Sequence, residues 1–265
     1  MPRARSRRER VPGPPDFIGV GGEGPGTDWW HAALVAHRQI EGPSGGAAAL
    51  HFFDGFCTRE MRDADVAGYH GRFPRRAGAI SGEWTGRYMC DGWVPTLLHR
   101  AAPDARLLVM LGDPIERYRT VFAERMASRV DDKRLRMTDV VDRACHATQL
   151  ERLGRYYDPD RILVLQLERC LQDPVAEYRR TLRFLGIADE AVPGGLRASV
   201  ADGGGGPVLG RRRGVPDAPR PEATEPLWPE LEAALHATLD PEVQALRALV
   251  PELDVRLWPN FAGLA

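Results

Sequence analysis

The chain has 265 residues, of which 43% are hydrophobic, which suits one sizeable domain better than two. Its formal net charge of −1 gives no global field that would favour nucleic acid or an acidic membrane surface. The 4 cysteines lie far apart, without the close pairs of a zinc or redox site, and no run of about 18 apolar residues predicts a membrane span. We therefore expect a cytoplasmic protein with free thiols, no metal, and no nucleic-acid or membrane partner.

Two segments of the chain have the composition of loops rather than of packed elements. Residues 1–15 are rich in Arg and Pro and lack the apolar core of a signal peptide. They predict a disordered tail ahead of one domain that covers residues 16–265. Within this domain, residues 194–226 cluster Gly, Pro and Arg without periodicity, which predicts a flexible loop.

The first element of the domain combines a strand, a glycine-rich loop and a helix. The apolar run Phe17–Val20 leads into a loop with four glycines and a proline, and a helical pattern follows from Thr27 to His37. Loop amides without hindering side chains, together with the positive end of a helix dipole, bind phosphate or sulfate. This stretch therefore predicts an anion-binding site.

Two familiar nucleotide-binding motifs match this loop only in part. The spacing Gly21-x-x-x-x-Gly26 is that of a nucleoside triphosphatase P-loop, but Thr27 and Asp28 stand where Lys and Ser or Thr would hold phosphate and magnesium. A dinucleotide fingerprint also fits Gly19-x-Gly21-x-x-Gly24, with Asp54 as its acid, but Pro25 falls where the helix should already have begun.

The remaining pattern alternates further strands and helices. Apolar runs predict strands at Ala47–Phe53, Ala79–Glu83, Arg106–Leu111 and Arg161–Gln166. Helical patterns start at Pro114, cover Val140–Tyr157 and Pro174–Leu185, and end in a pair over residues 228–250 that is broken at Pro241. The order predicts a single α/β domain with a mostly parallel central sheet flanked by helices.

The glycine-rich loop resembles the phosphosulfate-binding loop of bacterial sulfotransferases that use 3'-phosphoadenosine 5'-phosphosulfate (PAPS). Four further blocks resemble the same family in the same order. They are His51-Phe52-Phe53-Asp54, Gly82–Tyr88, Leu107–Phe122 and Arg161–Ile187, and Leu257–Phe261 is similar to the family's C-terminal end. The resemblance covers about residues 16–190 and implies the P-loop-like sulfotransferase fold, PAPS as donor and a small-molecule acceptor.

The resemblance implies a set of positions that contact the donor. Thr27 matches a residue that contacts the 5'-phosphate, and Trp29 lies at the adenine-stacking position, although a core tryptophan fits the pattern equally well. Gly112 and Thr120 match the positions that bind the 3'-phosphate, and Arg213 aligns with a loop that closes over it. The candidate cofactor-binding residues are Gly22, Glu23, Gly24, Pro25, Gly26, Thr27, Asp28, Trp29, Gly112, Thr120 and Arg213.

The chain departs from the family pattern mainly at positions where the family carries cations. Gly24, Ala48, Trp84 and Gly112 stand where the family has Arg or Lys, and Ala49 replaces a Glu. Asp28 replaces a Thr and adds a carboxylate that would repel phosphosulfate. Arg211–Arg213 could restore part of the lost charge, and loss of one buried Arg–phosphate pair costs about 2–5 kcal/mol.

Two residues are candidates for proton transfer. His51 and Glu83 fall near the ends of predicted parallel strands, where polar side chains point into the crevice that binds ligands. Either could remove the proton of an acceptor hydroxyl. The structural alternatives are a hydrogen-bonded strand histidine and a salt bridge between Glu83 and an arginine.

Three functions remain open at this stage. The first is transfer of a sulfuryl group from PAPS to a hydroxyl or amine of a small molecule. The second is other chemistry on a less anionic small molecule in the same crevice, by an enzyme that has lost the donor's cations. The third is a non-catalytic protein that binds a ligand or partner.

Overall fold

The computed structural model describes residues 10–22, 26–127, 139–188, 192–193, 196 and 226–265. Its centre is a sheet of five strands in the order β2-β3-β1-β4-β5, and every strand pair is parallel. The strands are β1 (Phe17–Gly21), β2 (Ile40–Glu41), β3 (Ile80–Trp84), β4 (Arg106–Leu111) and β5 (Ile162–Gln166). Because all five run the same way, the residues that follow them meet at one edge of the sheet.

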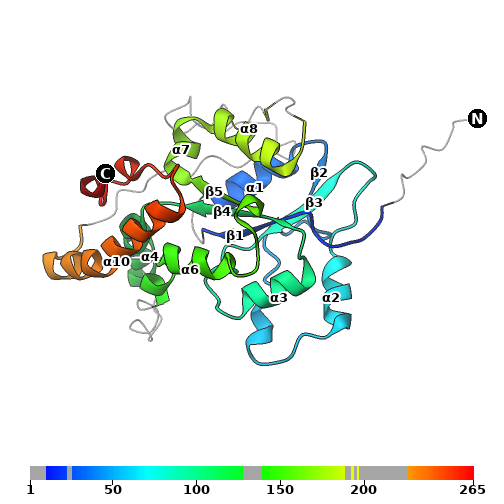
Figure 1. Cartoon of the computed structure of the whole chain (residues 1–265), viewed down its shortest axis with the longest axis horizontal. Helices are drawn as coiled ribbons and strands as arrows, with labels where there is room; N and C mark the ends of the chain where they lie inside the picture. The colour runs from blue at the N-terminus through cyan, green and yellow to red at the C-terminus, as the bar shows by residue number, and fades with distance from the viewer. Residues whose placement is uncertain (1–9, 23–25, 128–138, 189–191, 194–195, 197–225) are drawn as a thin grey trace, which may run out of the picture.

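Helices cover both faces of this sheet (Figure 1). The helices α1 (Thr27–Val35), α7 (Leu167–Gln172) and α8 (Pro174–Leu185) lie on one side. On the other side lie α2 (Asp63–His70), α3 (Val94–Ala101), α4 (Pro114–Ala127), α6 (His146–Leu153) and α10 (Pro229–Leu249). Short 3-10 turns occur at Asp54–Cys57, Pro159–Arg161, Val255–Leu257 and Ala262–Leu264.

The core divides into two layers because strand side chains alternate between the faces of the sheet. Phe17, Trp84 and Leu108 pack in the layer that includes α1 and α8. Ile18 and Leu107 pack in the opposite layer, which includes α3, α6 and α10. β1 and β4 are thus apolar on both faces, as expected for parallel strands buried between helices.

Most of the predicted elements are present, but the structure corrects three of them. The stretch Ala47–Phe53 is not a strand: it is irregular chain, and the strand beside β3 is instead the two-residue β2. The predicted helix Val140–Tyr157 is interrupted by turns at residues 143–144 before α6 begins. Helix α10 continues through Pro241, which was expected to break it.

Residues just before the predicted domain boundary at residue 16 already contact the domain. Val11 pairs with Arg75 through two backbone hydrogen bonds of 3.0 and 3.1 Å, and the Arg75 guanidinium donates to the carbonyl of Pro14. The rest of the predicted tail and nearly all of the predicted loop at 194–226 lie outside the described residues. Among the helices that the structure describes, none is long and apolar enough to cross a membrane.

Candidate functional site

The glycine-rich connection lies at the carboxyl end of β1, at the centre of the sheet. Gly22 has a φ of +79°, and a Cβ there would lie 2.1 Å from the carbonyl oxygen of Met110 in β4. Gly26 has a φ of +119°, which also requires glycine. The backbone therefore turns closely against β4 before α1, as predicted, whereas Glu23, Gly24 and Pro25 lie outside the described residues.

Helix α1 starts directly after this connection. Its N-cap is Gly26, whose carbonyl accepts from the amide of Trp30 at 2.9 Å, so Thr27 is the first helical residue rather than the cap. Asp28 is exposed in the first turn, where a carboxylate is favourable beside the helix dipole. Thr27 and Asp28 thus lie at the helix end where the sequence predicted them.

Trp29 lies in the core. Its side chain is 2% exposed and meets the ring of Trp30 edge to face, with 5.1 Å between the centroids. The sequence left open whether Trp29 stacks on adenine or packs in the core, and this burial favours packing.

Trp84 takes the place of a family lysine and packs against β1. Its indole Nε1 donates to the carbonyl of Gly21 at 3.1 Å, and a Cβ on Gly19 would lie 2.1 Å from its Cδ2 atom. The indole therefore covers the strand that leads into the glycine connection. It supplies a neutral donor, directed at the backbone, where a cation was expected.

Glu83 is completely buried and surrounded by donors. Its two carboxylate oxygens accept from the hydroxyls of Tyr69 at 2.7 Å, Thr85 at 2.6 Å and Tyr88 at 3.3 Å, and from the amide of Leu50 at 3.0 Å. Burial raises the pKa of Glu83 above its ordinary value, although the hydrogen bonds act in the opposite direction. The described partners are hydroxyls and an amide rather than the arginine that a structural salt bridge would provide.

This buried network holds the chain around His51. The Thr85 hydroxyl accepts from the amides of Leu50 and His51 at 3.0 and 3.3 Å, and the Tyr88 hydroxyl accepts from the amide of Phe52 at 2.9 Å. His51 itself has a φ of +50°, which is uncommon for a residue other than glycine. The backbone around His51 is thus held by hydrogen bonds to the hydroxyls of Thr85 and Tyr88, which follow β3.

The His51 side chain is exposed and paired with a carboxylate. Its Nδ1 lies 3.1 Å from Oδ2 of Asp54, and 54% of the His51 side chain is exposed. The structure therefore brings both candidate catalytic residues to the same edge of the sheet, with His51 open to solvent and Glu83 enclosed. Sequence reasoning missed the role of Asp54 and of the Tyr69, Thr85 and Tyr88 hydroxyls, although Ser81 and Glu83 of β3 and Thr85 just after it alternate as polar positions.

The turn between β4 and α4 is organised by Asp113. Its Oδ1 accepts from the amides of Ile115 at 2.9 Å and Glu116 at 3.2 Å, and its Oδ2 accepts from the amide and side chain of Asn260 at 3.1 and 2.9 Å. At Gly112, a Cβ would make only ordinary contacts of 3.5 Å. This position therefore has room for a side chain, but it brings only backbone to the site.

The other candidates around this turn bring no cation either. The Thr120 hydroxyl donates to the carbonyl of Glu116 at 3.1 Å, one turn back in α4. Arg119 binds Glu232 at 2.8 Å and Asn260 at 3.1 Å. Arg119 is thus already engaged by other side chains, and Arg213 lies outside the described residues.

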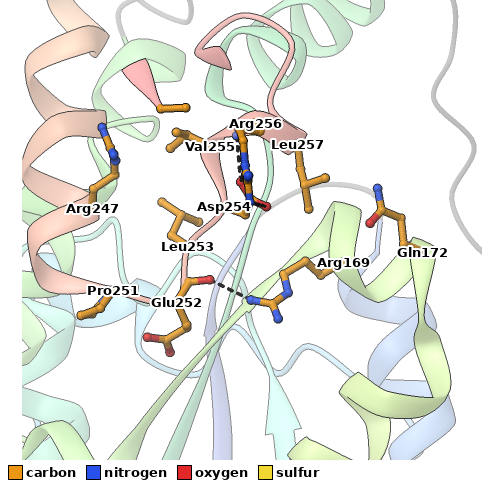
Figure 2. Close-up of a pocket in the computed structure, with 11 residues that line it drawn as sticks. Arg169, Gln172, Arg247, Pro251, Glu252, Leu253, Asp254, Val255, Arg256 and Leu257 are labelled. Atoms are coloured by element: carbon orange, nitrogen blue, oxygen red, sulfur yellow. Dashed lines mark hydrogen bonds and ion pairs between the residues drawn. The ribbon is translucent and has the colours of Figure 1, made fainter. Parts of the chain in front are cut away.

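A separate pocket of about 550 Å³ opens over α7 and the C-terminal segment (Figure 2). Its charged side chains are satisfied internally. Arg169 donates to the carbonyl of Glu252 at 2.7 Å, and Arg256 binds both carboxylate oxygens of Asp254 at 2.8 Å. The pocket follows β5 at the margin of the sheet, whereas the glycine connection follows β1 at its centre. It is therefore not the site that the sequence predicted.

Comparisons with known proteins agree with this architecture. The model of the sulfotransferase family matches residues 94–191, which run from α3 to beyond α8. Mouse heparan sulfate glucosamine 3-O-sulfotransferase 6 is 28% identical over 197 residues, which are 65% of this chain and 56% of that protein. Mouse heparan sulfate glucosamine 3-O-sulfotransferase 3B1 is 26% identical over 155 residues, which are 53% of this chain and 38% of that protein. The chain thus spans about half the length, or less, of the curated relatives that it matches.

Solved structures extend the similarity to nearly the whole chain. A sulfotransferase from Alicyclobacillus acidocaldarius superposes with a TM-score of 0.65 at 21% identity, covering 92% of this chain and 98% of that one. The sulfotransferase domain of the Synechococcus PCC 7002 olefin synthase superposes with a TM-score of 0.55 at 13% identity, covering 96% and 100%. The domain has the sulfotransferase fold. Over residues 94–191 the chain also matches the model of the sulfotransferase family, and the curated relatives named above are sulfotransferases.

Proposed function

We propose that the protein transfers a sulfuryl group from PAPS to a hydroxyl or amine of a small molecule. The observation that carries this proposal is the glycine connection between β1 and α1. Gly22 lies so close to the carbonyl of Met110 that no side chain fits, and α1 starts immediately after Gly26. Backbone amides near a helix N-terminus stabilise phosphate and sulfate groups without a cation.

At this edge of the sheet, backbone amides and hydroxyl groups would bind PAPS. The backbone amides of Gly22 and Gly26 and the first turn of α1 at Thr27 would hold the phosphosulfate, and the turn at Gly112 with Thr120 would face the 3'-phosphate. PAPS supplies the sulfuryl group. Backbone donors held by a helix N-terminus need little reorganisation as negative charge shifts during transfer.

His51 is the residue that we assign to proton removal. With Nδ1 donating to Asp54, Nε2 is the basic nitrogen and can accept the proton of an acceptor hydroxyl. Glu83 fits this role less well, because it is 0% exposed and its carboxylate already accepts four hydrogen bonds. We assign it to positioning His51.

A second function is favoured by a specific observation. Trp84 places a neutral indole against Gly21 where the resembling family carries a lysine, and Gly112 offers no side chain where it carries an arginine. A pocket that has lost these charges suits a less anionic ligand. An enzyme of other chemistry on a small molecule, or a non-catalytic binding protein, would explain both changes.

Calorimetric titration with adenosine 3',5'-bisphosphate, the desulfated product of the donor, tests the proposal. We expect a micromolar Kd that weakens between low and physiological salt, because phosphate contacts are screened by ions. Adenosine without phosphates is the matched control. Absence of binding at millimolar bisphosphate would overturn the proposal in favour of the second function.

The role of His51 is tested separately by His51→Asn. Asn tolerates the left-handed backbone at this position, so the variant should fold. Loss of a general base typically lowers turnover by about 100-fold or more. We expect that loss with unchanged binding of the bisphosphate, and a variant with near-normal turnover would exclude His51 as the base.

A further inference from the structure

The described tryptophans fall into two groups by exposure. Trp29, Trp30, Trp84 and Trp258 are at most 2% exposed, whereas Trp93 is 37% and Trp228 is 52% exposed. Trp228 packs its ring against Phe122 of α4, with 6.0 Å between the centroids. Trp93 instead lies in the turn before α3, and its surroundings connect it to His51.

Trp93 is held against the turn that carries the candidate base. Its indole Nε1 donates to the carbonyl of Phe53 at 3.2 Å. Phe53 is followed by Asp54, whose carboxylate binds the His51 ring. The exposed indole and the exposed imidazole are therefore fixed to the same four-residue segment, His51–Asp54. An aromatic ring oriented by a hydrogen bond, with part of its surface open, is suited to stacking with a ligand.

The charges around this segment are paired. Arg87 donates to both carboxylate oxygens of Asp91 at 3.2 and 3.3 Å. The hydrogen bond with Asp91 raises the pKa of Arg87, and Asp139 and Asp54 add smaller effects in the same direction. Arg59 likewise donates to both carboxylate oxygens of Asp65 at 3.0 Å, and Arg152 donates to the carbonyl of Cys90 at 3.3 Å, so these described guanidinium groups are already engaged. Such a surface does not attract a polyanion.

We propose that Trp93 is the stacking platform of the acceptor site and that the acceptor is an uncharged compound whose hydroxyl is carried on a ring. Stacking on the indole would place the ring beside His51, and the paired charges would exclude a highly sulfated chain. This inference rests on the proposed function, because it names the acceptor class of the same site. The ring is either a sugar or a phenol, since both pack against an aromatic face.

Direct binding tests this inference independently of catalysis. Saturation-transfer NMR would be recorded with phenol, with methyl β-glucopyranoside and with a heparin tetrasaccharide, on the wild-type chain and on Trp93→Ala, Trp93→Phe and Trp228→Ala. We expect one of the two neutral rings to bind, roughly threefold to tenfold more weakly to Trp93→Ala, with recovery in Trp93→Phe. Trp228→Ala, which removes the other exposed indole, should bind like the wild type.

The outcomes separate this inference from the proposed function. Equal binding to wild type and Trp93→Ala, binding of the tetrasaccharide in preference to both neutral rings, or binding of no probe would each overturn the inference. Circular dichroism of each variant would show whether it is folded, and Trp93→Phe serves if Trp93→Ala is not. Titration with adenosine 3',5'-bisphosphate, which Trp93→Ala should leave unchanged, reports on the proposed function alone.

Discussion

Glu83 and His51 are both candidates by sequence, but their surroundings separate their roles. A carboxylate with 0% exposure and four donors is already saturated, whereas an exposed imidazole with one carboxylate partner has a nitrogen to offer. Leaving buried donors without an acceptor costs more than the bonds themselves contribute. At the scale of single residues, the burial of Glu83 therefore stabilises the segment that His51 occupies.

Substitution of Glu83 tests this structural role. Glu83→Ala should lower the free energy of unfolding by about 3–5 kcal/mol, because three hydroxyls and the Leu50 amide lose their common acceptor. Glu83→Gln keeps one carbonyl acceptor and should cost about 1–2 kcal/mol. Urea denaturation measures both. A loss below about 0.5 kcal/mol in Glu83→Ala would contradict this role.

A cation can be returned to the β4–α4 turn at Gly112. A Cβ at this position meets only ordinary contacts, and its φ lies outside the left-handed region, so Gly112→Arg should fold. We expect at least about tenfold tighter binding of adenosine 3',5'-bisphosphate, because Arg forms charge-assisted hydrogen bonds with phosphate. Gly112→Gln, with a neutral side chain, is the matched control in the calorimeter. Equal affinities for the two variants would argue against a phosphate site at this turn.

At the scale of elements, β3 connects the two layers of the core. Its residues alternate, so that Trp84 packs against β1 on one face while Glu83 binds Tyr69 on the other. Neighbouring β1 accommodates the indole only because Gly19 has no side chain. The strand thus joins the glycine connection to the His51 segment.

Gly19→Ala tests this packing. The added Cβ would lie 2.1 Å from the Trp84 ring, so the indole must leave its place and release its bond to Gly21. Overpacking of this kind typically costs about 1–3 kcal/mol. Gly68→Ala is the control, because a Cβ at this helical position meets nothing within 4 Å and should be neutral or stabilising. Thermal unfolding of both variants would reveal the contrast, and similar midpoints would refute it.

At the scale of the whole molecule, the C-terminal segment is joined to the turn between β4 and α4. The indole of Trp258 donates to Glu168 at 2.9 Å, and Glu168 accepts from the amide of Asp113 at 3.0 Å. Asn260 binds the other side of Asp113. Residues about 90 and 147 positions apart thus enclose the β4–α4 turn.

Asn260→Ala tests this closure. The variant loses the side-chain amide that donates to Asp113 at 2.9 Å and to Glu116 at 3.0 Å. The control is Gln172→Ala, because the Gln172 side chain is exposed. We expect the free energy of unfolding to fall by about 1–3 kcal/mol in Asn260→Ala and by less than about 0.5 kcal/mol in the control. Chemical denaturation compares them. Equal losses would mean that the segment is not coupled to the turn.

The pH dependence of global stability should carry the signature of Glu83. Burial raises the pKa of Glu83 in the folded protein above the ordinary value of 4.5. The contribution of Glu83 to the free energy of unfolding is therefore complete below pH 4.5 and is lost as the pH rises through the folded-state pKa. We expect this component, a decrease in unfolding free energy with rising pH, to be absent from Glu83→Gln. Denaturation of both proteins across a pH series measures the difference. Identical pH profiles would contradict the raised pKa.

Parts of the fold depend on local chemistry and could therefore be predicted from the sequence alone. Apolar runs identified β1, β3, β4 and β5, and the start of α8 at Pro174 follows from the preference of proline for a first helical turn. The apolar run at residues 47–53 wrongly predicted a strand. Its backbone amides at Leu50 and Phe52 instead donate to the hydroxyls of Thr85 and Tyr88, which hold the segment in an irregular conformation. Helix α10 continues past the exposed Pro241 while Leu239 and Val243, on either side of it in sequence, are buried in the core.

The sequence by itself determined the α/β class, the strands β1, β3, β4 and β5, the glycine connection after β1 and the resemblance to sulfotransferases. These depend on periodicity, on backbone preferences and on motifs that are local in the chain. Only the tertiary structure decided that Glu83 is enclosed and His51 exposed, that Trp29 and Trp84 pack in the core, and that Asn260 completes the turn at Asp113. Burial and long-range hydrogen bonds join residues that are far apart in sequence, and no local pattern specifies them.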